Sequence, residues 1–162
     1  MREILEALVQ EEAHLVLDES DKYYIRFIPR DWDQDTLKVG KEWADKWTKT
    51  GRILLFEFSN RDTIRLKLAI GPGPEVVRRK LFDMALRGSA FRPRREVLQR
   101  KWNTIFSRKF LKVVPEPYEE YRDEILERLD QEWAEFLEQD LPRLDAFLKQ
   151  EKWIWEAAES HE

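Results

Sequence analysis

The sequence predicts an α+β fold, in which an antiparallel sheet of about four strands is covered by helices and followed by a helical C-terminal half. The first observation is a pair of β-rich segments, each split by a short polar turn, at residues 15–29 and 52–70. The second is the helical spacing of apolar residues after residue 74. Strands gathered in one part of a chain and helices in the other are typical of α+β domains.

Length and composition limit the classes of protein that this chain can belong to. Its 162 residues fit one domain, residues 1–162, with a β-rich part at 1–73 and a mostly helical part at 74–162. Hydrophobic residues make up 42% and charged residues 38%, which indicates a globular chain with a heavily charged surface. The absence of cysteine excludes disulfides and thiolate metal sites, and we expect a cytoplasmic location. No apolar run could cross a bilayer, so we expect no membrane partner.

The β-rich part begins with a helix and a first hairpin. Residues 2–13 place apolar residues on one helical face, which predicts a short amphipathic helix. Two β-rich runs at 15–29 flank a polar turn at 19–22, which predicts a hairpin. A further short helix is expected at 40–48, with Gly51 closing it.

A second hairpin is the clearest element, in the segment RILLFEFSNRDTIRLKLAIG at 52–71. We expect a three-residue loop at 60–62, because this register pairs apolar with apolar residues on one buried face. On the other face it places Glu57 opposite Arg65. The expected apolar pairs are Phe58 with Ile64, Phe56 with Leu66, and Leu54 with Leu68.

Four helices are expected in the second part of the chain. The first runs from about 74 to 87 and ends at Gly88. The second is expected at 94–111. A long acidic helix is expected at 117–139, and Pro142 opens or kinks the last one. The second helix is predicted from the helical spacing of its apolar residues, Leu98, Trp102, Ile105, Phe106 and Phe110.

Charge is distributed unevenly along the chain, although the net charge is only −4. Residues 1–75 hold 12 basic and 15 acidic residues, residues 76–112 hold 12 and 2, and residues 113–162 hold 5 and 16. The segment 76–112, which we call the basic block, therefore has a net charge of +10, and the last segment has −11. Because electric fields act locally, these segments matter more for partners than the total does.

A corner rich in glycine and proline, IGPGPE at 70–75, precedes the basic block. Free N–H groups at a helix start and close approach at glycine would suit an anion. Against this, Pro72 and Pro74 lack N–H donors and Glu75 repels anions. The segment also lacks the patterns of a phosphate loop or a dinucleotide fingerprint. Both interpretations stay open, and the sequence favours a structural corner.

The basic block is the strongest functional signal in the sequence. It could follow a phosphate backbone, with aromatic residues of the same segment stacking on bases, although their spacing favours core positions. Alternatively, its cations pair with the acidic C-terminal segment or across a dimer. We expect the binding partner to be nucleic acid or another polyanion. The alternative is a protein partner or a homodimer, docked through the acidic helix or the Trp153/Trp155 tail. The expected contact residues are Arg78, Arg79, Arg92, Arg94, Arg95, Arg100 and Lys101.

Catalytic groups are sparse. His14 and His161 are the only histidines, and neither suggests a base or a ligand pair. The acids of the 31–35 loop lack the glycine and the final glutamate of a calcium loop, so we interpret them as solvated.

A nuclease site is incomplete as well. Glu57 and Lys67 both lie off the apolar face of the second hairpin, but residue 59 is Ser, so the Glu-x-Lys of a nuclease strand is missing. We expect no enzyme activity, no cofactor and no metal. A metal-dependent hydrolase using Glu57 with an acid of the 31–35 loop is the less favoured alternative.

Four segments together resemble a known family. They are YYIRFIPRDWD, GRILLFEFSN, LKLAIGPGPEVVRRKLFD and KWNTIFSRKFL. Their order and spacing resemble the C-terminal region of bacterial PD-(D/E)XK nuclease-like proteins, over about residues 22–140. In that family the nuclease core lies N-terminal to this region, so no catalytic residue carries over. The resemblance implies an accessory domain, in a defence, restriction or mobile-element setting, that helps to recognise nucleic acid or a protein partner.

Overall fold

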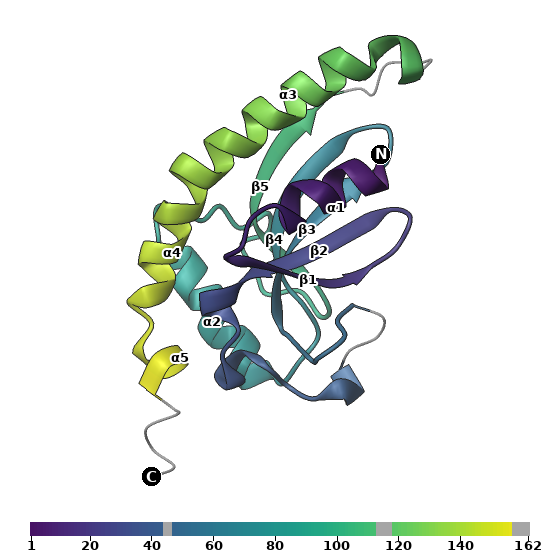
Figure 1. Cartoon of the computed structure of the whole chain (residues 1–162). Helices are drawn as coiled ribbons and strands as arrows, with labels where there is room; N and C mark the ends of the chain where they lie inside the picture. Colours follow the sequence, from purple (N-terminus) through teal and green to yellow (C-terminus); the bar gives the residue numbers. More distant parts are fainter. Residues whose placement is uncertain (44–46, 113–117, 157–162) are drawn as a thin grey trace.

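The computed structural model of the chain describes residues 1–43, 47–112 and 118–156. An α+β fold is confirmed: one antiparallel sheet has the strand order β1-β2-β3-β4-β5, so that strands adjacent in the chain are adjacent in the sheet (Figure 1). The strands are β1 (Leu15–Ser20), β2 (Tyr24–Pro29), β3 (Leu54–Asn60), β4 (Ile64–Ile70) and β5 (Asn103–Leu111).

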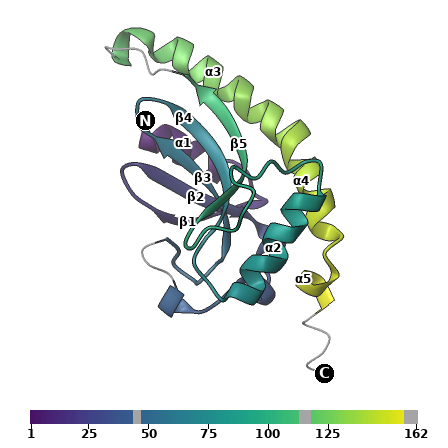
Figure 2. The same ribbon diagram turned by 180° about the vertical axis from the view of Figure 1, so that it is seen from behind.

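Helices precede, interrupt and follow the sheet. The main ones are α1 (Arg2–Gln10), α2 (Glu75–Arg87), α3 (Arg122–Glu135), α4 (Leu141–Lys149) and α5 (Lys152–Glu156). A π-helical turn at Phe136–Asp140 joins α3 to α4, and Pro142 lies in the first turn of α4, as expected. Figures 1 and 2 show α3 and α4 as one long rod along the side of the sheet. No helix of the described residues is long and apolar enough to span a membrane.

One face of the sheet is a dry aromatic core, which we call the covered face. Phe27 and Phe56 stack with ring centroids 5.2 Å apart, and Phe58 lies 5.7 Å from Trp133 of α3. Phe136 adds an edge-on contact to Phe56 at 5.3 Å. These aromatic side chains bury large apolar areas, which is the main stabilising term in folding. The stripe on α3 is therefore what holds the long helix to the sheet.

The second hairpin has a different register from the expected one. Phe58 pairs with Leu66 and Phe56 with Leu68, and the loop is residues 61–63 rather than 60–62. The shift is two residues, so every side chain stays on the expected face. Glu57 consequently lies opposite Lys67, not Arg65. Asn60, expected in the loop, pairs with Ile64 as the last pair before the loop.

The helix expected at 94–111 was wrong, and the second part is less helical than expected. Residues 103–111 form the fifth strand, β5, along β4. In the segment NTIFSRKFL, Phe106, Arg108 and Phe110 alternate along the strand, and β-branched Thr104 and Ile105 favour extended backbone. Since β4 would otherwise expose an unpaired edge, pairing with β5 is favoured over a helix.

Other expectations hold only in part. The first helix ends at Gln10 rather than 13, and α2 begins at Glu75 as expected. Of the short helix expected at 40–48, residues 44–46 lie outside the described residues, and 41–43 form a 3-10 turn. Gly51 has a φ of 80°, a left-handed conformation that favours glycine. The beginning of the helix expected at 117–139 lies partly outside the described residues, and α3 begins at Arg122.

Candidate functional site

The face of the sheet opposite the aromatic core, which we call the open face, is polar. Because side chains alternate along a strand, the residues between the buried aromatic positions point to this face. They include Arg26 of β2, Glu57 of β3, and Arg65 and Lys67 of β4. Figure 2 shows the molecule from this side, with α2 below and to the right of the strands. Two neighbouring hollows lie on it.

The first hollow, which we call the basic hollow, has a volume of about 600 Å³. Its walls carry five cationic side chains and a single carboxylate, that of Asp62. Hydroxyl groups complete the lining, and these can also donate to an anion. The lining residues are Ser59, Arg61, Asp62, Thr63, Arg65, Lys67, Arg92, Arg94, Thr104 and Ser107.

Backbone pairing places these cations from distant parts of the chain. The loop between β3 and β4 supplies Arg61, and β4 supplies Arg65 and Lys67. Residues 92–94 run beside β5, since the N–H of Arg92 donates to the Ile105 carbonyl at 2.7 Å and that of Arg94 to the Thr104 carbonyl at 2.9 Å. These bonds bring a segment of the basic block to the edge of the hollow.

The cations of the basic hollow have no acidic partner among the residues that the structure describes. Within the described part of the chain, none of the five forms an ion pair. Arg65 donates to the Ser107 hydroxyl at 3.0 Å, and Arg61 to the Tyr24 hydroxyl at 3.3 Å. Positive charges gathered in a concave surface without counter-charges create a field that attracts anions. The arrangement therefore suits phosphate groups.

The second hollow, which we call the aromatic hollow, has a volume of about 400 Å³. Arg26 lies over the rings of Tyr24 and Trp47, 5.3 and 5.2 Å from their centroids, and donates from Nε to Glu57 Oε2 at 2.8 Å. Lys67 and Thr104 line both hollows, so the two form one tract across the open face. Its lining residues are Asp21, Tyr24, Arg26, Trp47, Glu57, Lys67, Ala69, Trp102 and Thr104.

The predicted contact residues lie in different places. Arg92 and Arg94 line the basic hollow, whereas Arg79 is exposed on α2 and Arg95 is exposed beside the hollow without lining it. Arg100 and Lys101 line a separate hollow with Trp43 and the glycine- and proline-rich corner. The structure thus brings only two of the seven into the tract.

Arg78 was predicted to contact a ligand, but it is buried. It is 5% exposed, and its guanidinium makes five hydrogen bonds, to the carbonyls of Gly71, Gln99, Arg100 and Lys101 and to Asn103 Oδ1, at 2.8–3.0 Å. An arginine has five N–H donors, so all are used. Burial lowers the pKa of Arg78. Arg78 therefore links the corner at 70–75 to the segment before β5, which supports a structural role for this corner.

Arg108 shows that part of the basic block pairs internally, as the alternative interpretation expects. It contacts the carboxylates of Glu132, Glu135 and Asp140, at 2.7 Å for Glu132 and 2.9 Å for Asp140. Burial alone would lower the pKa of Arg108, but the hydrogen bonds to Glu132 and Asp140 outweigh it and raise that pKa. Arg108 therefore holds β5 to α3 and is unavailable to a ligand.

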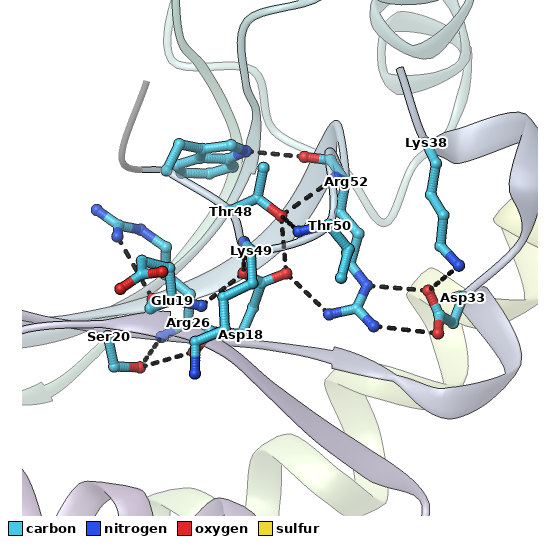
Figure 3. A network of polar contacts seen from close by, with 11 residues as sticks. Asp18, Glu19, Ser20, Arg26, Asp33, Lys38, Thr48, Lys49, Thr50 and Arg52 are labelled. Atoms are coloured by element: carbon cyan, nitrogen blue, oxygen red, sulfur yellow. Dashed lines mark hydrogen bonds and ion pairs between the residues drawn. The ribbon is translucent and has the colours of Figure 1, made fainter. Parts of the chain in front are cut away.

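The acids of the 31–35 loop belong to a structural network (Figure 3). Arg52 donates to Asp18 Oδ2 at 2.8 Å and to Asp33 Oδ1 at 2.9 Å, and Asp18 is buried and also accepts from Thr48. Burial alone would lower the pKa of Arg52, but the bonds to Asp33 and Asp18 raise it. The hydrogen bond from Arg52 lowers the pKa of Asp33. This network links Asp33 and residues 47–52, including Trp47, to Asp18 of β1.

The alternative hydrolase site is not assembled. Glu57 pairs with Arg26 rather than with Arg65, and Asp33 with Arg52. Within residues 1–43, 47–112 and 118–156, no three acidic or histidine side chains gather closely enough to hold a metal ion. His14 is exposed beside Glu12, and His161 lies outside the described residues.

The two tail tryptophans that could dock on a partner contact the chain itself. Trp155 donates to the Leu148 carbonyl at 3.0 Å, and Lys149 lies over its ring at 4.1 Å. Trp153 donates to Glu151 at 3.0 Å, with Lys80 over its ring. Both are partly buried, so they anchor α5 to the body of the protein.

Three of the hollow's cations, Arg61, Arg65 and Lys67, were missed by the sequence prediction. They lie outside the basic block, in a segment whose net charge is negative. For Arg65 and Lys67, the alternation in IRLKL was the available signal, because its apolar residues face the core and its two cations face the other way.

Comparisons with protein-family models, with curated proteins and with solved structures return no match. The resemblance to PD-(D/E)XK nuclease-like proteins therefore stays a prediction.

Proposed function

We propose that this protein binds single-stranded nucleic acid on the open face of its sheet. The observation that carries the proposal is the basic hollow, in which five cations meet one carboxylate and form no ion pair within the described residues. Backbone phosphates supply the matching charges, and binding led by the backbone is salt-sensitive and weakly dependent on sequence.

The aromatic hollow favours a single strand over a duplex. Proteins that bind single strands combine a cationic groove with aromatic side chains on which unstacked bases lie. The tract has this composition, because the exposed Trp102 and the half-buried Tyr24 lie next to the five cations and Lys67 lines both hollows. Bases in a duplex are paired and stacked, so they would leave the aromatic hollow unused.

Fluorescence anisotropy with a labelled 12-nucleotide oligo(dT), at two salt concentrations, tests the proposal. Removing Lys67, Arg92 and Arg94 together by alanine should weaken binding and reduce the slope of log K against log salt by about 2, since each lost phosphate contact contributes about 0.7.

A matched control removes the same charge elsewhere. Arg79, Arg122 and Lys152 are exposed and line neither hollow, so the corresponding triple alanine variant should keep the salt slope of the wild type. An equal loss in both variants would show that net charge alone drives binding, and it would contradict a site on the open face. A duplex that binds more tightly than the single strand would contradict the proposed ligand.

A further inference from the structure

We propose that the aromatic hollow is a nucleobase subsite that selects guanine through the carboxylate of Glu57. The inference rests on the proposed binding of single strands and adds a base preference to it. Glu57 is 8% exposed and lines the hollow from the middle of β3. A buried carboxylate at the wall of an open hollow is costly unless it is paired.

Glu57 is only partly satisfied by the protein. Its Oε2 accepts from Arg26 Nε at 2.8 Å, and this is its one hydrogen bond within the described residues. A carboxylate has lone pairs for about four hydrogen bonds, so Glu57 can accept further donors. Lys67 faces it across the ladder and forms no ion pair in the described part of the chain. The group thus has acceptor capacity beyond its bond to Arg26, and it lines the hollow.

The dimensions and the walls fit one base. A volume of about 400 Å³ lies within the range of small-molecule sites, about 300–1,000 Å³. Trp102 is 44% exposed at the wall, which leaves part of its ring available for stacking. The base would lie in the aromatic hollow while its phosphate lies in the basic hollow, because Lys67 and Thr104 border both.

The chemistry of the carboxylate points to guanine. Guanine presents two adjacent donors, N1–H and the 2-amino group, and a carboxylate can accept both. Adenine and cytosine present a ring acceptor beside their amino donor, and thymine presents one donor between two carbonyls. For these bases an acceptor would face the negative charge of Glu57. A good two-bond contact to a base discriminates by between about 5-fold and 100-fold.

The experiment measures the affinity of the wild-type chain for labelled 12-nucleotide oligo(dT) in which one central base is dT, dA, dC, dG or inosine. A single guanine avoids four-stranded structures. We expect dG to bind at least about 5-fold more tightly than dT, dA or dC. Inosine lacks the 2-amino group, so it should lose most of that gain. This comparison needs no variant and therefore no assumption about folding.

Two variants then assign the contact. Glu57→Gln should bring the ratio of dG affinity to dT affinity close to one, and Trp102→Ala should weaken all five oligonucleotides, with thermal unfolding confirming that each variant folds. Equal affinities for all bases would overturn the guanine subsite and leave single-strand binding intact. A dG preference that Glu57→Gln does not change would overturn the role of Glu57. No binding to any oligonucleotide would overturn the proposed function, and the subsite with it.

Discussion

On the covered face of the sheet Arg108 lies among three carboxylates, whereas on the open face Arg92 and Arg94 have no carboxylate within ion-pair distance in the described residues. All three come from the same basic block of the sequence. The difference lies in the neighbours that the fold provides, because the acidic helix α3 packs against β5 where Arg108 lies. Arg108 is therefore neutralised by the protein itself, whereas Arg92 and Arg94 are not paired with any carboxylate of the described residues.

Arg78 is a second cation of the basic block whose hydrogen bonds are made within the protein. It has the sequence context of a binding residue, yet all five of its donors are used by protein oxygens. These contacts separate Arg78 and Arg108, whose guanidinium groups are used by the fold, from Arg92 and Arg94, which we propose to contact the ligand. Each of the following variants tests one side of that division, in order of the expected loss of stability.

The largest loss is expected for Arg78→Met, which keeps much of the side-chain volume and removes the guanidinium. Five acceptors would lose their donor, and a buried acceptor without a partner is destabilising. We expect the free energy of unfolding to fall by about 3 kcal/mol or more, measured by urea denaturation. A loss below about 1 kcal/mol would contradict a structural role for the Arg78 guanidinium.

A smaller loss is expected for Arg108→Ala. The substitution leaves Glu132, Glu135 and Asp140 close together without their shared cation, and like charges near one another repel. These groups are partly exposed, so we expect a loss of about 1–3 kcal/mol rather than that of a fully buried pair. Arg122→Ala, at the exposed start of α3, is the matched control and should change stability by less than about 0.5 kcal/mol.

The hydrogen bonds between Arg52 and Asp33 predict a contribution to stability that depends on pH. The pKa of Asp33 is lowered in the folded chain from its ordinary value of 3.8, chiefly by the hydrogen bond from Arg52. The carboxylate therefore stabilises the fold above that ordinary value, and this contribution disappears as the pH falls through the lowered pKa. In urea denaturation at several pH values, Asp33→Asn should be less stable than the wild type at pH 7, and the difference should shrink below about pH 4. A difference that is constant down to pH 3 would contradict the pairing.

The hairpins could be predicted from the sequence because alternating apolar residues define both the strands and their buried face. The predicted register of the second hairpin was off by two residues, because a shift of two keeps every side chain on the same face and leaves the apolar pattern almost equally well matched. The fifth strand could not be predicted, because Trp102, Phe106 and Phe110 fit a helical stripe while Phe106, Arg108 and Phe110 fit a strand. Only the unpaired edge of β4 decides between them, and it is a tertiary feature.

The candidate site was predictable to a similar extent. The charge count along the sequence pointed to the segment that supplies Arg92 and Arg94. It could not show that Arg78 and Arg108 are used by the fold, because their partners lie 21 to 32 residues away as well as nearby. Nor could the charge count show that Lys67 lies with Arg92 and Arg94. Residues 92–94 bond to β5, and β5 pairs with β4, which carries Lys67.

The central claim is that the cations of the open face are available to phosphates and contribute little to the fold. The most direct test measures both properties of one variant, Lys67→Ala with Arg92→Ala and Arg94→Ala, by urea denaturation and by anisotropy with oligo(dT) at two salt concentrations. We expect stability within about 0.5 kcal/mol per site of the wild type, together with weakened binding and a salt slope lower by about 2. Unchanged binding, or a fold that fails while binding per folded molecule persists, would contradict the claim.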